Sequence, residues 1–348
     1  MSRAPLTPSR ILVVRLDRIG DVVLSTPALT ALSTAIPHAF IAVMVRPECR
    51  DLVQGHPAVH EVIEYDKDGR HRSAWATVRF ARRLRRYGFD AAIVLHPTNR
   101  SHWIPWLAGI PARIGFRRKS SWLLTHRLPH RKQEGKRHEA DYTLELLRFV
   151  GAGAGEARPT IALQPGAVRR VDEVLAGWAQ AGRPIVAIHP SASCPSKRWM
   201  PDRFARVADR LIAERGAQVC IVAGAADAAW AQAMAQAMRQ PVLNLAGRLT
   251  LAELAAVLRR AAVLVSNDSG PVHVAAAVGT PVVAIFGRNQ AGLSVQRWGP
   301  LGEGHVVLQK DVGCVTCLAH ACDIGFRCLT SLAADEVYQA AASLLSRV

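Results

Sequence analysis

The sequence predicts an α/β protein with two parallel sheets, one in each half of its 348 residues. Short apolar runs alternate with helical segments along both halves, a pattern typical of parallel strands covered on both faces. The alternation weakens between residues 151 and 183, where glycine and proline gather. We therefore expect an N-terminal Rossmann-like domain over 1–160, a linker over 161–183 and a C-terminal Rossmann-like domain over 184–348.

The first half opens with the apolar run Ile11 to Leu16, which reads as a buried strand followed by a turn at Gly20-Asp21. A helical segment continues to about Ile36, and an arginine-rich helix is expected over 73–86. The further strands expected here are 40–45, 62–65 and 89–95.

The second half restarts the alternation at residue 185. Its expected strands are 185–188, 218–223, 241–245, 263–266 and 282–286, and its expected helices are 203–215, 228–238, 251–260 and 272–278.

The most informative turn is Ser266-Asn267-Asp268-Ser269-Gly270-Pro271, between a buried strand and an alanine-rich helix. A helix N-terminus presents unpaired N–H groups and the positive end of the helix dipole, which suits a phosphate. The alternative is an ordinary turn capped by Asn or Asp.

Polar motifs follow three expected strands, at 17–21, 189–199 and 267–273. Ligands of open parallel sheets bind beyond the carboxyl ends of the strands. Two halves that face each other would bring all three motifs into one cleft.

Charge is unevenly distributed. The chain has a formal net charge of +17, and residues 1–160 hold 26 Lys and Arg against 14 Asp and Glu, compared with 18 against 13 in the remainder. An anionic partner of the first half is expected, and a solvated basic surface is the alternative. No nucleic-acid-binding motif accompanies the charge, so we expect no nucleic-acid partner. The sequence has no apolar run of membrane-spanning length and no signal-peptide pattern, which predicts a cytoplasmic protein.

The segments RLDRIGDVVLSTPAL (15–29), LAGIPARIGF (107–116), HPSASCPSKRW (189–199) and NDSGPVHVAAAVGTPVVAIFG (267–287) resemble glycosyltransferase family 9, the ADP-heptose:lipopolysaccharide heptosyltransferases. The resemblance implies a GT-B fold, in which two Rossmann-like domains face each other across a cleft. It also implies inverting, metal-independent transfer of heptose from ADP-heptose to the inner core of lipopolysaccharide, with no cofactor required. The expected partners are the nucleotide sugar, an anionic lipopolysaccharide precursor (Kdo-lipid A or a heptosyl acceptor) and the inner face of the inner membrane, contacted by a peripheral monomer.

The family match assigns Asp21 as the catalytic base, with Asp17 as a weaker candidate and a helix N-cap as the alternative role of Asp21. An inverting transferase needs such a group to take the proton of the acceptor hydroxyl. Lys197 matches the family lysine beside the donor phosphates. The donor site implied by the resemblance comprises Ser193, Lys197, Asp227, Gly247, Asp268, Ser269, Gly270, Pro271, Val272 and His273. For His273, packing against the sheet is an equal alternative.

Basic and polar residues of the first half are expected to contact the phosphates and carboxylates of the acceptor. These acceptor-site residues are Arg18, His96, Asn99, Arg113, Arg117, Arg118 and Lys119. A nearby triplet, Arg137-His138-Glu139, reads instead as a capping and solvating cluster.

Four of the seven cysteines cluster near the C-terminus as Cys314, Cys317, Cys322 and Cys328. The spacing of the second pair is wider than in common zinc ribbons, so reduced, buried thiols are favoured over a structural metal. No metal is expected in catalysis. Other functions left open are heptosyl transfer to a protein or another glycan, and sugar-nucleotide epimerisation on a GT-B fold.

Overall fold

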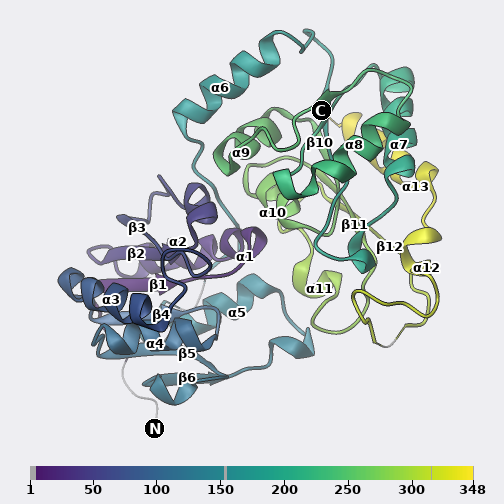
Figure 1. Cartoon of the computed structure of the whole chain (residues 1–348). Coiled ribbons are helices and arrows are strands. Elements are labelled where there is room, and N and C mark those ends of the chain that lie inside the picture. The colour runs from purple at the N-terminus through teal and green to yellow at the C-terminus, as the bar shows by residue number, and fades with distance from the viewer. Residues whose placement is uncertain (1–4, 153–154, 315, 348) are drawn as a thin grey trace. The chain divides into compact units, whose positions relative to one another are not determined.

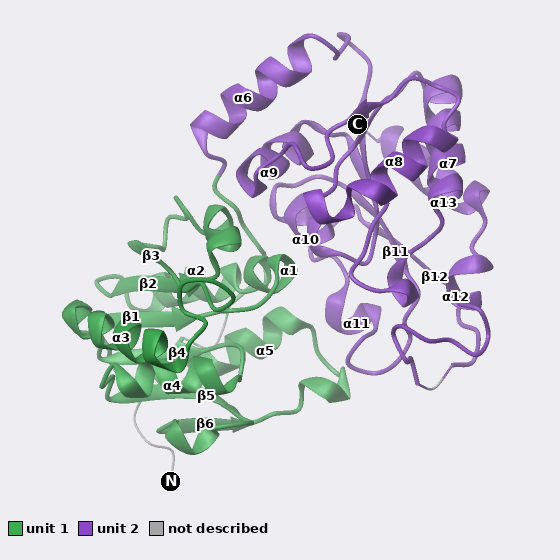
Figure 2. Ribbon diagram, in the orientation of Figure 1, with its two compact units in different colours: residues 1–162 green, residues 163–348 purple. Residues whose placement is uncertain are grey.

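A computed structural model describes residues 5–152, 155–314 and 316–347. The chain divides into two compact units, residues 1–162 and 163–348 (Figure 2). Each unit contains one six-stranded sheet whose strand pairs are all parallel. The α/β class with two parallel sheets is thereby confirmed.

Unit 1 has the strand order β3-β2-β1-β4-β5-β6. Its strands are β1 (Arg10–Val14), β2 (Phe40–Val45), β3 (Glu61–Glu64), β4 (Ala91–Val94), β5 (Ala112–Arg117) and β6 (His126–Pro129). Its helices are α1 (Ile19–Val23), α2 (Thr26–Ala35), α3 (Ala74–Leu84), α4 (Asn99–Leu107) and α5 (Glu139–Leu146).

Helices α3 and α4 lie side by side in unit 1 (Figure 1). Their apolar residues Phe80, Leu84 and Ile104 join Leu12 and Val14 of β1 in one buried cluster. Helices α2 and α5 pack against each other. Buried strands of this kind carry apolar side chains on both faces, which is why the short runs could be recognised in the sequence.

Unit 2 repeats the topology, with the order β12-β11-β10-β7-β8-β9. Its strands are β7 (Ile185–His189), β8 (Gln218–Ile221), β9 (Leu243–Asn244), β10 (Val263–Asn267), β11 (Val282–Phe286) and β12 (Val306–Gln309). Its helices are α6 (Pro165–Ala176), α7 (Pro201–Arg215), α8 (Ala228–Ala237), α9 (Leu251–Arg260), α10 (Gly270–Ala277), α11 (Val295–Trp298), α12 (Arg327–Thr330) and α13 (Ala334–Leu345).

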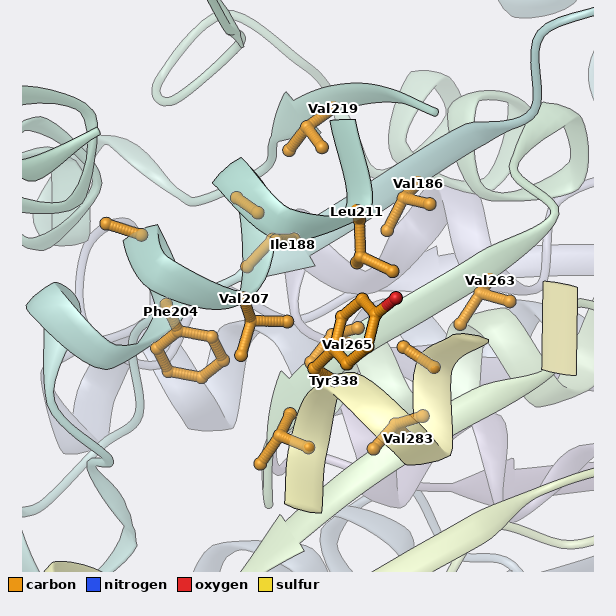
Figure 3. Close-up of a cluster of buried hydrophobic side chains, with 14 of the residues drawn as sticks. Val186, Ile188, Phe204, Val207, Leu211, Val219, Val263, Val265, Val283 and Tyr338 are labelled. Carbon is orange, nitrogen blue, oxygen red and sulfur yellow. The ribbon is translucent and has the colours of Figure 1, made fainter. Parts of the chain in front are cut away.

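The core of unit 2 fills one face of its sheet (Figure 3). Alternate residues of the central strands, such as Val186, Ile188 and Val265, meet α7 through Phe204 and Leu211. Helix α13 closes the same cluster with Tyr338. In the sequence these strands are short, continuous apolar runs, and it was these runs that predicted them.

The expectation of a linker over 161–183 is corrected within that range by α6, a twelve-residue helix with proline in its first turn. Its buried residues Val171 and Leu175 are four apart and lie on one face, and α6 packs on α9. Pro165 and Gly166 in its first turn hid this helix, because both residue types are loop signals, whereas proline is tolerated at the start of a helix.

The switch point of each sheet lies between its two central strands, where the chain connections diverge in opposite directions. In unit 1 this point lies between β1 and β4, and in unit 2 between β7 and β10. Candidate ligand sites are therefore expected beyond the carboxyl ends of these four strands.

Candidate active site

Beyond the carboxyl ends of β1 and β4, unit 1 assembles a cluster of charged side chains around Arg15. This arginine directly follows the apolar run of β1, and only 1% of its surface is exposed. Its Nε lies 2.9 Å from Oδ1 of Asp17, and its Nη2 lies 2.6 Å from Oδ1 of Asp21 and 3.2 Å from Oε1 of Glu139. Lys132 Nζ lies 2.6 Å from the same Glu139 oxygen.

The burial of Glu139 corrects one sequence-based interpretation. Glu139 was assigned to a capping and solvating cluster, but the structure buries it together with Lys132. Both side chains are nearly inaccessible, at 2% and 4% exposure. Glu139 can be buried because Lys132 and Arg15 supply the opposite charge, and Lys132 can be buried because Glu139 does. His138 does cap α5, accepting from the N–H of Ala140 as expected of that position.

The charges of this cluster contribute to the raised pKa of Asp17. Three carboxylates, Asp17, Asp21 and Glu139, face the two cations Arg15 and Lys132. Burial, reinforced by Asp21 and Glu139 and opposed by Arg15, raises the pKa of Asp17 to about 7. Uptake of one proton there balances the charge of the cluster.

His96 follows β4 and places its Nδ1 3.3 Å from Oδ2 of Asp17. Burial, with the cations Arg15 and Lys132 nearby, lowers the pKa of His96 to about 3. The imidazole is therefore neutral at physiological pH, and the surplus negative charge stays on the carboxylates.

Asp21 lies in the first turn of α1, and its side chain is 18% exposed. The N-cap of α1 is Arg18, so the alternative role of Asp21 as the N-cap of this helix is wrong. Its Oδ1 is held by Arg15 while the side chain keeps access to solvent. Asp21 is thus a carboxylate fixed at the rim of the switch point.

An open pocket of about 700 Å³ adjoins this edge of the unit 1 sheet. It is lined by Leu16, Tyr65, Lys67, Asp68, Arg72, Thr98, Asn99 and Arg100. Three of these residues, Lys67, Arg72 and Arg100, are basic. Of the whole lining, only Asn99 was predicted from the sequence to contact the acceptor. The three basic residues could have been found from their positions, because Lys67 and Arg72 follow β3 and Arg100 follows β4.

The other residues assigned to the acceptor fall in different places. Arg18 is exposed beside Asp21. Arg117 ends β5, and Arg118 and Lys119 follow it, so all three lie exposed at the carboxyl edge of the sheet. Arg113 lies near the amino end of β5, and its guanidinium donates to the carbonyls of Ile110, Pro111 and Leu123. It holds this loop, and the structure does not bring it to Asp21.

In unit 2 the switch point places Lys197 against Asp268, with Nζ 2.7 Å from Oδ2. Asp268 follows β10 directly and is buried, while Lys197 is 19% exposed. Ser269 is the N-cap of α10, and Pro271 stands in its first turn, where a missing N–H costs nothing. A partly exposed lysine and a helix N-terminus therefore lie at one turn, as a phosphate site requires.

His189 and Asn267 brace this turn, although neither was assigned to the site from the sequence. Ser191 Oγ lies 3.1 Å from Nε2 of His189, and Ser269 Oγ lies 3.1 Å from its Nδ1. Burial lowers the pKa of His189 to about 4, so the ring is neutral. Asn267 accepts from the N–H of Trp199 and donates to the carbonyl of Pro190. The ends of β7 and β10 are thereby joined by side chains.

The remaining residues assigned to the donor from the sequence lie at the same edge of the unit 2 sheet. Ser193 is exposed in the loop after β7, and Asp227 ends a 3₁₀ turn after β8, close enough to influence the pKa of His189. Gly247 (φ +71°) donates to the carbonyl of Ala223. Gly270 begins α10, while the side chains of Val272 and His273 are buried. The side chain of Val272 is therefore not available to a ligand.

The C-terminal cysteines are free thiols, but they are not buried as expected. Cys314 is exposed, and Cys317, Cys322 and Cys328 are half-exposed. Of these four, Cys328 packs against the core cluster of unit 2 but is only partly buried. Over residues 5–152, 155–314 and 316–347, no three His, Cys, Asp or Glu side chains are placed to hold one metal ion.

Comparison with known proteins agrees with this architecture. The sequence pattern of glycosyltransferase family 9 (heptosyltransferase) matches residues 77–325. Lipooligosaccharide heptosyltransferase 2 of Haemophilus ducreyi is 30% identical over 300 residues, which cover 80% of this chain and 83% of the relative. The enzyme of the same name from Haemophilus influenzae is 27% identical over 297 residues, with the same coverage.

Two solved structures show the same fold. A family 9 glycosyl transferase from Veillonella parvula superposes with a TM-score of 0.85 at 25% identity, covering 98% of each chain. The ADP-heptose lipopolysaccharide heptosyltransferase II of Escherichia coli gives 0.79 at 24% identity, over 97% of this chain and 99% of its own. The GT-B class is confirmed, while a shared cleft between the units stays a prediction. The protein belongs to glycosyltransferase family 9 (heptosyltransferase) and is a glycosyltransferase.

Proposed function

We propose that this enzyme transfers heptose from ADP-heptose to the inner core of a lipopolysaccharide precursor, with inversion and without a metal ion. The observation that carries the proposal is a pair of switch points with complementary chemistry. Unit 1 presents the carboxylate of Asp21, and unit 2 presents Lys197 beside the N-terminus of α10. The names of the relatives supply the sugar and the class of acceptor.

The donor diphosphate is proposed to bind at the turn between β10 and α10. Lys197 approaches this turn through its ion pair with Asp268, so its ammonium is already positioned there. The N–H groups of the first turn of α10 add the positive end of the helix dipole. These groups supply the positive charge that a divalent cation supplies in other transferases, which is why we propose metal-independent transfer.

The chemical step joins the two sites. Asp21 takes the proton of the acceptor hydroxyl while that oxygen forms a bond to the anomeric carbon of heptose. The bond from this carbon to the diphosphate oxygen breaks, and its electron pair leaves with ADP, whose charge Lys197 stabilises. Attack from the face opposite ADP inverts the anomeric configuration. Arg15 orients the carboxylate of Asp21 throughout.

The acceptor is proposed to occupy the open pocket at the edge of unit 1. Lys67, Arg72 and Arg100 line this pocket and suit the carboxylates and phosphates of a Kdo-containing core. Arg18, His96 and Asn99 lie at the same edge. Substrates of this kind place the reaction at the cytoplasmic face of the inner membrane, where we propose that a monomer acts as a peripheral enzyme.

A panel of donors and acceptors tests the proposal. Purified enzyme is incubated with ADP-heptose or with other ADP-, GDP- and UDP-sugars, and with deacylated cores that end in Kdo, in the first heptose or in a later sugar. Mass spectrometry measures the product, and nuclear magnetic resonance gives its anomeric configuration. We expect transfer from ADP-heptose to one of these cores, with inversion and unchanged by a chelator.

Three results would overturn parts of the proposal. Equal use of another nucleotide sugar contradicts the assigned donor, and a retained configuration contradicts the direct displacement. Loss of activity in chelator, restored by a divalent cation, contradicts the role given to Lys197. Transfer to a protein but to none of the cores would replace the acceptor.

A further inference from the structure

Unit 1 exposes a cluster of tryptophans that neither switch point uses. Trp103 and Trp106 project from α4, and Trp122 belongs to a 3₁₀ turn after β5. Their exposed fractions are 36%, 42% and 64%. Trp103 packs edge-on against both others, with ring centroids 5.4 Å from Trp106 and 6.0 Å from Trp122. The three rings thus form one continuous apolar surface open to solvent.

The basic loop 117–119 adjoins this surface. Trp103 Nε1 donates to Ser120 Oγ at 3.2 Å, and Ser120 Oγ donates to Asn99 Oδ1 at 3.1 Å. These bonds hold the residues after Lys119 against α4. Arg117, Arg118 and Lys119 are all exposed, and none pairs with a carboxylate in the described part of the chain.

Lys119 adds a conformational observation. Its φ is +56°, a left-handed conformation that non-glycine residues seldom adopt. Lysine has no local hydrogen bond that would favour this conformation, in contrast to asparagine or aspartate. The loop therefore keeps three consecutive cations at its tip at a cost in backbone energy.

We propose that Trp103, Trp106, Trp122, Arg117, Arg118 and Lys119 form a docking surface for an anionic lipid bilayer. Tryptophan favours the boundary between headgroups and acyl chains, because its ring is apolar and its N–H is polar. Adjacent unpaired cations fit the negative potential of an anionic leaflet, each raising partitioning about fivefold. A protein partner would need carboxylates that match three cations, whereas a bilayer supplies negative charge at every such position.

This inference rests on the proposed function only in that the acceptor is a lipid. Docking through this surface would hold the carboxyl edge of the unit 1 sheet near the leaflet, since loop 117–119 follows the carboxyl end of β5. Helix α3, beside α4, carries the exposed Arg79, Arg82 and Arg83 and extends the positive charge. None of the three tryptophans belongs to the proposed catalytic or acceptor sites.

Flotation with acceptor-free vesicles tests the proposal. Full-length protein is mixed with phosphatidylcholine vesicles, with or without about one third phosphatidylglycerol. We expect binding that requires the anionic lipid and falls as salt rises. Brominated acyl chains should quench tryptophan fluorescence in the bound protein. Equal binding to both vesicles, or no quenching, would overturn the proposal.

Variants locate the surface. Replacing Trp103, Trp106 and Trp122 by alanine, and separately Arg117→Glu with Arg118→Glu, should each weaken partitioning at least about tenfold. Arg169→Glu with Arg170→Glu, exposed on α6, makes the same change of net charge and should leave binding near the wild-type value. Equal losses in this control would show that total charge alone drives binding.

Two further measurements, of heptose transfer and of self-association, distinguish the possible results. The tryptophan variant should transfer heptose to a soluble, deacylated core at the wild-type rate, which also shows that it folds. Absence of transfer in the wild type contradicts the proposed function and leaves vesicle binding standing. A concentration-dependent dimer that the tryptophan variant abolishes, with no vesicle binding, assigns the surface to a second copy and overturns the proposal.

Discussion

Glu139→Gln perturbs the buried charge cluster of unit 1 at its centre. The carboxylate of Glu139 is 2.6 Å from Lys132 and 3.2 Å from Arg15, and all three side chains are almost fully buried. Glutamine preserves the shape of the side chain and removes only its charge. Lys132 keeps its place 4.8 Å above the ring of Phe116, a weaker interaction than the one lost.

The size of the effect follows from burial. Removing one partner of a buried ion pair costs about 3–5 kcal/mol, because the remaining charge is desolvated without compensation. For a unit of 162 residues, this loss lowers the unfolding temperature by roughly 6–20 °C.

The loss of stability caused by Glu139→Gln depends on pH. Below the pKa of Asp17, about 7, the cluster is balanced, and loss of Glu139 leaves one surplus positive charge. Above that pKa the same loss removes a surplus negative charge instead. The destabilisation should therefore be larger at pH 5 than at pH 8.

Urea unfolding followed by circular dichroism at the two pH values measures this difference. Glu145→Gln is the matched control on the same helix, because Glu145 pairs with Arg137 at the surface and should cost less than about 1 kcal/mol. Lys132→Met combined with Glu139→Gln should recover part of the loss, since no cation is left unpaired. A Glu139→Gln protein as stable as the control at both pH values refutes the cluster as described.

Three further predictions follow from the structure. Asp17→Asn should flatten the pH dependence of stability. The raised pKa of Asp17 makes the wild-type protein lose stability as pH rises from about 4 to about 7. Urea unfolding across that pH range measures the effect. Lys197→Met should lower kcat about 10²–10³-fold in a steady-state assay. The control Lys310→Met breaks a surface ion pair and should leave kcat unchanged. Gly247→Ala should cost more stability than Gly216→Ala. Both glycines have a positive φ, but only at Gly247 would the new Cβ lie 3.3 Å from a backbone atom. Thermal unfolding of the two variants measures the difference.

Local sequence signals were sufficient for most of the buried strands and for the turn between β10 and α10. Residues 251–260 and 282–286 form α9 and β11 with the expected bounds, because apolar periodicity and capping residues act over a few positions. The turn after β10 was recognised for the same reason: its hydroxyl, amide and glycine groups are contiguous in the chain.

The cluster around Arg15 could not be read in this way. Glu139 lies 124 residues from Arg15, and its burial depends on tertiary packing of α5 that no local pattern encodes. Strand β5 and the edge strand β6 were missed for a related reason. Their residues include arginine, histidine and glycine, and pairing with neighbours rather than composition makes them strands.

The exposure of the tryptophan surface could not be predicted from the sequence either. Trp103 and Trp106 are three apart on a helix and Trp122 is distant in sequence, and no local pattern distinguishes them from a buried tryptophan. Only the structure shows that Trp199 fills a core while these three remain exposed.

Single-turnover transfer by Asp21→Asn tests the central claim most directly. The amide keeps the size of the side chain but accepts no proton. With ADP-heptose saturating and a deacylated core as acceptor, the rate should fall about 10²–10⁴-fold, while the Kd for ADP stays near the wild-type value. Transfer at the wild-type rate would contradict the assignment of Asp21 as the base that activates the acceptor.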